Sequence, residues 1–229
     1  MTQPARQLAL SLPHRPALGR EDFWVAQSNE AAVAQVEAWP GWPATGLAVV
    51  GPRGSGKTHL AHVFAQLAKA PLVPLSDVSI ARLDGWVEHK AVAFDCPPDS
   101  VPAFDEEALF HLFNAMTASG GHILIAAGVP PARWDVRLAD LKSRLATFQI
   151  AQLGPPDDAL LGAVLMKHFA DRQLRVEPEL IDYLLPRMDR SLWAAGQLVA
   201  ALDQASLEKK RKLSVPLARG VLEALGEEE

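Results

Sequence analysis

The sequence predicts an α/β protein with a parallel five-stranded sheet, followed by a smaller C-terminal subdomain made of helices. Three observations support this fold class. Short apolar runs alternate with helical segments up to about residue 155, and a glycine-rich turn joins the first of these strands to a helix. Beyond Pro155-Pro156 only helical spacing recurs. Because the strand-like runs are continuously apolar, we expect both faces of the sheet to be covered.

The core segments follow one another as in a sheet with crossover helices. A first helix is expected to begin at Ser28-Asn29-Glu30 and to stop at Trp39-Pro40, because Ser and Asn cap helices and Pro ends them. The predicted strands cover residues 47–50, 72–75, 91–95, 123–126 and 148–153. The main helices expected between them cover residues 57–70 and 105–118.

After the two prolines, four segments carry apolar residues at helical spacing, and no strand interrupts them. They cover residues 157–171, 178–186, 191–207 and 215–225. We therefore divide the chain into an extended leader over residues 1–20, an α/β core over residues 21–155 and a helical subdomain over residues 156–229. The tryptophans at 39, 42, 86 and 193 are expected to be packing residues.

Composition narrows the class of protein. The chain has 229 residues, a formal net charge of −5 and 49% hydrophobic residues, which excludes a disordered chain and argues against a strongly basic surface for nucleic acid. The single Cys96 excludes an internal disulfide. No apolar run is long enough to span a membrane and no signal peptide is recognisable, so we expect a cytoplasmic protein. The basic run at residues 208–212 fits either a solvated loop or a nucleic-acid contact.

Residues 51–58 read Gly-Pro-Arg-Gly-Ser-Gly-Lys-Thr and fit the phosphate-loop pattern G-x4-G-K-[ST]. The pattern lies between a predicted strand and a predicted helix, which is the context it requires. Glycines let successive N–H groups face phosphates, and the helix N-terminus adds positive potential. Lys57 is expected to reach the outer phosphates and Thr58 to bind Mg²⁺. An ordinary glycine-rich turn is the alternative.

The strand predicted at residues 91–95 ends on Asp95, which is expected to hold the magnesium shell. Many hydrolysing phosphate-loop proteins place a second carboxylate next, where it orients the attacking water. Here that position is Cys96, and Asp99 lies beyond two further prolines. A thiol cannot serve as that base with comparable effect. The sequence therefore favours tight binding of ADP or ATP with slow hydrolysis.

Several segments together resemble the DnaA-like AAA+ family over roughly residues 20–225. Residues 106–115 resemble the helix after the Walker B strand in DnaA, and residues 22–25 resemble the segment that opens that family's AAA+ domain and packs near the adenine. Shorter similarities follow in the family's order at Pro130-Pro131, Ser143-Arg144-Leu145 and residues 189–192. The resemblance implies an AAA+ P-loop NTPase core and makes the C-terminal helices its lid.

Within that family the chain looks most like the Hda group of DnaA-related regulatory inactivators. We expect neither a DNA-reading helix-turn-helix domain after the lid nor a separate domain before the core. The leader residues Gln7, Leu8, Leu10 and Leu12 are similar to the Hda peptide that docks on the DNA polymerase sliding clamp. Leucines at period two can enter a shallow pocket while the glutamine amide bonds at its rim. Pairing of this segment as an edge strand is the alternative.

The resemblance also implies site residues. Arg144 resembles the arginine finger that projects toward a neighbouring subunit's nucleotide, although a lone arginine near a helix end is usually a surface ion pair. Arg190 resembles the second sensor, which reaches from the lid to the nucleotide, although it could be a simple helix-end charge. The nucleotide-binding residues are expected to be Phe23, Val25, Gly51, Pro52, Arg53, Gly54, Ser55, Gly56, Lys57, Thr58, His59 and Arg190, with Thr58 and Asp95 on Mg²⁺.

These assignments predict a negative regulator of DNA replication initiation with a weak ATPase of its own. Ala126-Ala127-Gly128 stands where DnaA-like sensors carry a polar residue, and with Cys96 it removes two aids to hydrolysis. The expected partners are DnaA, whose bound ATP would be hydrolysed in trans, and the β subunit clamp of DNA polymerase III. A homo-oligomer is considered, DNA is expected only through the clamp, and no membrane is expected. A DNA-acting ATPase or helicase loader that oligomerises on single-stranded DNA, and a small phosphotransferase, are the alternatives.

Overall fold

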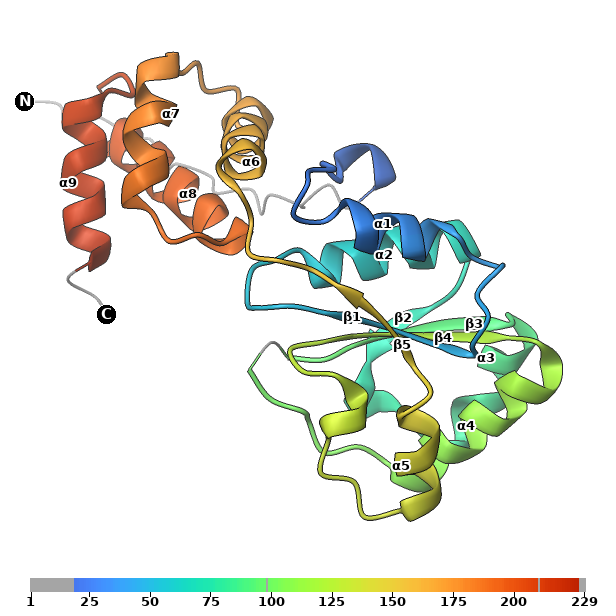
Figure 1. Ribbon diagram of the computed structural model, residues 1–229. Coiled ribbons are helices and arrows are strands. Elements are labelled where there is room, and N and C mark those ends of the chain that lie inside the picture. The colour runs from blue at the N-terminus through green and yellow to red at the C-terminus, as the bar shows by residue number, and fades with distance from the viewer. Residues whose placement is uncertain (1–18, 98, 210, 227–229) are drawn as a thin grey trace, which may run out of the picture.

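The computed structural model describes residues 19–97, 99–209 and 211–226 and has a three-layer core with a helical lid at one end (Figure 1). Five parallel strands form one sheet in the order β2-β3-β4-β1-β5. The parallel five-stranded sheet predicted from the sequence is therefore confirmed. The strands are β1 (Gly46–Val50), β2 (Leu72–Pro74), β3 (Ala91–Asp95), β4 (His122–Ala127) and β5 (Gln149–Gln152).

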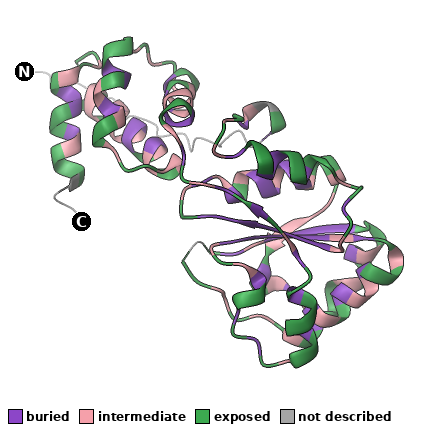
Figure 2. Ribbon diagram, in the orientation of Figure 1, coloured by how far each residue is buried: buried purple, intermediate pink, exposed green. Residues whose placement is uncertain are grey.

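The central strands are buried almost throughout, and the two edge strands are less so (Figure 2). In the register of the sheet, Val50 pairs with Ala127 and Asp95 pairs with Ala126. Because the strands are parallel, the carboxyl ends of β1, β3 and β4 meet at one edge of the sheet. The loops that follow these strands are thereby brought together, and this edge positions the candidate site.

Helices cover both faces of the sheet (Figure 1). One face packs against α1 (Glu30–Glu37) and α2 (Lys57–Ala68), and the other against α3 (Leu83–Glu88), α4 (Glu106–Ser119) and α5 (Ala139–Leu145). Strand β1 contributes side chains to the apolar clusters on both faces of the sheet, because successive side chains of a strand point to opposite faces. Leu47 and Val49 join the α1–α2 cluster, and Ala48 and Val50 join the cluster with α4 and α5.

Four helices form the lid, and their apolar side chains make a cluster of their own. They are α6 (Asp158–Asp171), α7 (Pro178–Leu184), α8 (Leu192–Lys209) and α9 (Val215–Gly226). The Asp157 carboxylate accepts the Leu160 N–H at 2.8 Å and caps α6, a contact worth about 1 kcal/mol. Strand β5 ends at Gln152, so the predicted boundary near residue 155 lies in the connection to α6. The division into three parts remains a prediction.

Shorter elements complete the chain. Within the ranges given above, 3₁₀ turns cover Arg20–Asp22, Leu75–Asp77, Ile80–Arg82, Pro131–Arg133 and Leu185–Arg187. Helices α3 and α5, of six and seven residues, were not predicted. In this part of the chain, no helix combines the length and the apolarity that crossing a membrane requires.

Candidate nucleotide site

The loop between β1 and α2 curls tightly around its own carbonyl groups. Gly54 has φ +70° and Gly56 has φ +97°, in the left-handed region that glycine adopts without strain. The Lys57 ammonium donates to the carbonyl oxygens of Gly51 at 2.9 Å and Pro52 at 2.7 Å. Burial lowers the pKa of Lys57, and the charges of two nearby aspartates oppose that shift. The lysine is therefore held within the loop, next to the place where phosphates would bind.

The pair expected to hold Mg²⁺ joins α2 to the end of β3. The Thr58 hydroxyl donates to the Asp95 carboxylate, with its oxygen 3.2 Å from Oδ1 and 3.1 Å from Oδ2. Burial raises the pKa of Asp95, while the Thr58 hydrogen bond lowers it. Over the described residues, no cluster of three or more His, Cys, Asp or Glu could hold a metal. Mg²⁺ commonly uses one carboxylate, phosphates and water, which suits this pair.

A cavity of about 500 Å³ opens beside the loop and lies between core and lid. Its size is within the usual range of about 300–1,000 Å³ for small-molecule sites. The core contributes Asp22, Arg53, Gly54, Gly56, Lys57, Thr58, His59 and Cys96. The lid contributes Val164, Lys167, His168, Leu192 and Trp193.

The loop fits a phosphate group. Among the residues that the structure describes, the buried Ser55 Oγ has no hydrogen-bond partner. A Cβ atom at Gly51 would lie 2.7 Å from that oxygen, and one at Gly54 would lie 2.5 Å from the Ser191 Cβ. A side chain at either glycine would thus collide with its neighbours and close the space within the loop. The loop N–H groups, Lys57 and Thr58 are the groups that would hold a nucleoside phosphate here.

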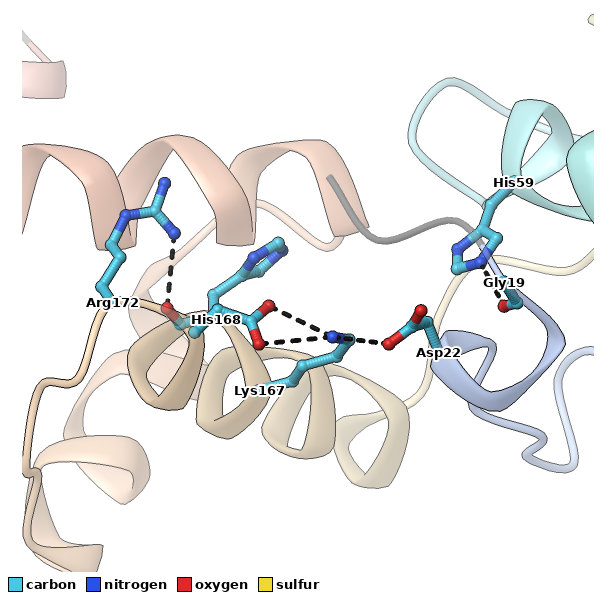
Figure 3. A network of polar contacts seen from close by, with 7 residues as sticks. Gly19, Asp22, His59, Lys167, His168 and Arg172 are labelled. Atoms are coloured by element: carbon cyan, nitrogen blue, oxygen red, sulfur yellow. Dashed lines mark hydrogen bonds and ion pairs between the residues drawn. The ribbon is translucent and has the colours of Figure 1, made fainter. Parts of the chain in front are cut away.

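A polar network lies beside the cavity, and its members Asp22, His59, Lys167 and His168 line it (Figure 3). The Lys167 ammonium, from α6, lies 2.9 Å from Asp22 Oδ1 and 3.1 Å from Asp171 Oδ2. The Lys167 hydrogen bond lowers the pKa of Asp22, and the same bond raises the pKa of Lys167. His59 Nε2 lies 3.2 Å from the Gly19 carbonyl oxygen, and burial lowers the pKa of His59. The network joins the lid to the start of the core.

Six of the residues assigned to the nucleotide are absent from the lining of this cavity, namely Phe23, Val25, Gly51, Pro52, Ser55 and Arg190. Val25 is 41% exposed and lies outside the lining. The Arg190 guanidinium donates to Asp158 Oδ1 at 2.6 Å and to the Pro156 carbonyl oxygen at 3.1 Å. The Arg190 guanidinium is thus paired with a carboxylate at the start of α6. Phe23 is 6% exposed and packs edge-on against the ring of His59, a residue that lines the cavity.

Several lining residues, among them Asp22, Lys167 and Trp193, were not assigned to the nucleotide from the sequence. Asp22 lies in the segment that was compared with the start of the AAA+ domain, but its contact with Lys167 joins segments far apart in the chain, and no local pattern marks Lys167 as part of a site. The assignment of Trp193 to packing was wrong, because its side chain is 55% exposed and stands over the loop. Trp42 and Trp86 are buried as predicted.

The residue after β3 and the last two residues of β4, where groups that assist hydrolysis were looked for, are apolar or neutral. Cys96 is 4% exposed, and burial together with the charge of Asp95 raises the pKa of its thiol to about 12. Its backbone N–H donates to the carbonyl oxygen of Ala126, which is buried on β4 with Ala127. A neutral thiol and two methyl groups therefore occupy positions where a base and a polar sensor were sought. Slow hydrolysis stays a prediction.

Arg144 lies on α5, across the sheet from the phosphate-loop helix α2 (Figure 1). Its side chain is exposed, and its guanidinium carbon lies 5.8 Å from the centre of the Phe113 ring. Within the described part of the chain, Arg144 forms no ion pair. The predicted clamp-binding residues Gln7, Leu8, Leu10 and Leu12 lie outside the described residues.

Solved structures with the same fold are AAA+ proteins. Domain III of the Thermotoga maritima replication initiation protein DnaA superposes with a TM-score of 0.73 at 21% identity, over 93% of this chain and 98% of that one. AMPPCP-bound DnaA from Aquifex aeolicus gives 0.68 at 20% identity, over 85% and 67%. The T. maritima RuvB branch migration motor gives 0.68 at 16% identity, over 91% and 72%. These similarities establish the AAA+ fold.

Sequence comparison settles the family. Residues 158–222 match the family model described as the lid domain of Hda. An uncharacterized protein of Haemophilus influenzae is 34% identical over 183 residues, which cover 75% of this chain and 79% of that protein. The chain is an Hda-like member of the DnaA-related AAA+ proteins. For an Hda-like protein, these matches support a DnaA-related role in the regulation of replication.

Proposed function

We propose that this Hda-like protein is a negative regulator of replication initiation that stimulates hydrolysis of DnaA-bound ATP in trans. One observation carries the proposal: Arg144 is exposed on α5 and makes no ion pair within the described residues. A guanidinium already paired with a carboxylate would have to break that ion pair before it could bind a phosphate on another protein. The Phe113 ring supports the cation without neutralising its charge.

In its own site the protein would hold ADP or ATP. The loop N–H groups and Lys57 would bind the phosphates, and Thr58 and Asp95 would hold Mg²⁺. When bound, Mg²⁺ supplies compensating positive charge for the phosphates. Cys96 offers a neutral thiol and cannot accept a proton from water at neutral pH. The nucleotide would therefore remain bound for long periods and be hydrolysed slowly, and while bound it would stabilise the fold and the lid.

In trans, Arg144 would approach the γ-phosphate of ATP on DnaA. A guanidinium there stabilises charge that develops in the transition state, and such a finger is worth about 10³–10⁵ in rate. The leader residues Gln7, Leu8, Leu10 and Leu12 would dock on the sliding clamp and so bring the core to DnaA near DNA. DNA would be met only through the clamp. The leader, core and lid divided at about residues 20 and 155 would then have separate tasks.

The first experiment measures phosphate release from ATP-loaded DnaA mixed with this protein and clamp loaded on DNA. The native protein should accelerate release, and Arg144→Ala should return it to the rate of DnaA alone. Lys142→Ala, which removes another exposed cation from α5, should keep the stimulation. An Arg144→Ala protein that stimulates as well as the native one would contradict the proposal, as would rapid hydrolysis by the native protein alone.

The second experiment tests the leader separately. Clamp immobilised on beads should retain the native protein, and Gln7→Ala should weaken retention by about tenfold, because it removes both ends of the amide from the rim of the pocket. Gln3→Ala, a change of the same kind four positions earlier, should bind like the native chain. Equal retention of the two variants would contradict docking through Gln7.

A further inference from the structure

The lid contacts the phosphate loop at the first turn of α8. The Leu192 N–H donates to the Gly54 carbonyl oxygen at 2.7 Å. Ser191 packs so closely that a Cβ atom on Gly54 would lie 2.5 Å from the Ser191 Cβ. The Ser191 hydroxyl also accepts the Ala194 N–H at 3.0 Å. The first residues of α8 are thus fixed against the loop by contacts that do not involve a ligand.

This anchoring sets Trp193 over the loop residue Arg53. The guanidinium carbon of Arg53 lies 4.9 Å from the centre of the indole ring, within the range of a cation–π contact. Both residues also line the cavity. Trp193 is 55% exposed, so this large apolar side chain lies on the surface, where it contacts the Arg53 guanidinium.

Arg53 has a second partner on the core. Its Nη1 lies 3.7 Å from Asp99 Oδ2, and both side chains are more than half exposed. An exposed ion pair at that distance contributes little. A phosphate group accepts shorter, bidentate hydrogen bonds from a guanidinium. Arg53 can therefore exchange Asp99 for a phosphate while its face stays on the indole.

We propose that Trp193 is a positioning residue of the nucleotide site, which holds the Arg53 guanidinium at the mouth of the cavity for a nucleoside di- or triphosphate. The bound phosphates would take Arg53 from Asp99 and leave it stacked on Trp193, which joins the lid to the loop. The inference rests on the proposed binding of a nucleotide. It adds a lid residue that the phosphate-loop pattern does not contain.

The test is a titration of each variant with ADP that carries a fluorescent ribose label. Trp193→Ala and Arg53→Ala should each weaken binding by about fivefold, and the double variant should be no weaker than Arg53→Ala, because the two residues act through one contact. Trp193→Phe keeps an aromatic face and should bind within about twofold of the native protein. Arg82→Ala removes a similarly exposed arginine, paired with Asp77, and should change nothing.

A second readout uses unlabelled ADP and tryptophan emission. The native protein should change its emission on binding, and most of that change should be absent from Trp193→Phe and from Arg53→Ala. Native affinity in Trp193→Ala, or losses that simply multiply in the double variant, would overturn the inference and leave nucleotide binding intact. A native protein that binds no labelled ADP would overturn both the inference and the proposed nucleotide site.

Discussion

Cys96 shows how one residue can limit the chemistry of an otherwise complete phosphate loop. It follows Asp95 directly at the end of β3, where the backbone is fixed by the hydrogen bond to Ala126. Burial excludes water from the thiol, and the nearby carboxylate opposes a second negative charge. Both effects favour the neutral thiol. The residue is therefore neither a base nor a reactive nucleophile.

The reactivity of Cys96 can be measured directly, because it is the single cysteine of the chain. Since its pKa is about 12, the thiolate fraction at pH 8 is lower than that of an ordinary thiol by on the order of a thousandfold. We expect a thiol reagent to label the native protein at least about a hundredfold more slowly than the urea-unfolded protein. Equal labelling rates in the two states would contradict the burial of this thiol.

At the same scale, only residues with a local signal could be assigned from the sequence. Lys57 and Thr58 follow glycines at a fixed spacing, so their place was predictable before the fold was known. Trp193 and Lys167 gain their roles when α8 and α6 dock on the core, and nothing in their neighbours in the chain encodes that docking. Arg190 was assigned to the nucleotide from the resemblance, and in the structure its guanidinium pairs with Asp158, so its role at the nucleotide stays a prediction.

Among the elements, α6 is joined to the core by the side chain of Lys167. Lys167 forms ion pairs with Asp22 at the start of the core and with Asp171 one turn along its own helix. The bounds of α6 were predicted to within one residue, because a capping aspartate and a regular apolar stripe mark them. The contact with Asp22 was not predictable, since the 3₁₀ turn Arg20–Asp22 has too few residues to show a pattern.

Replacing Lys167 by Met should loosen the lid while changing global stability by less than about 1 kcal/mol, because the pair is partly exposed. Hydrogen exchange should speed up in residues 20–23 and in α6, where the contact is lost. Asp171→Asn is the matched control, since it removes the bond within the helix and leaves the bond to Asp22. Equal exchange in the native protein and Lys167→Met would show that this pair does not hold the lid.

At the scale of the whole molecule, the α/β core and the helical lid are two bodies with a cavity between them. The sheet and its covering helices build one body, and the lid helices pack around an apolar cluster of their own. Alternating strands and helices, then helices alone, were enough to predict both bodies. Their placement was not predictable, because it depends on a few contacts such as Leu192 to Gly54 and Lys167 to Asp22. Those contacts create the cavity.

We expect two half-buried imidazoles to make the stability of the protein depend on pH. His59 lies in the cavity wall, and His122 packs edge-on against Trp42 at 5.4 Å. Burial lowers the pKa of both histidines below the ordinary value of 6.5. As the pH falls below 6.5, the unfolded chain therefore takes up protons that the folded protein resists, and unfolding becomes easier. Above that pH both states carry neutral imidazoles, so this effect vanishes.

We expect the urea midpoint of unfolding to stay nearly constant from pH 8 to 7 and to fall between pH 6.5 and 5.5. Asp95 acts in the opposite sense, because burial raises its pKa and its protonation favours the folded state, but its carboxyl titrates from the ordinary value of 3.8 upward. His122→Asn should reduce the fall, and His89→Asn, which changes an exposed histidine, should preserve it. A midpoint that rises on acidification to pH 5.5 would mean that the aspartate outweighs the two histidines.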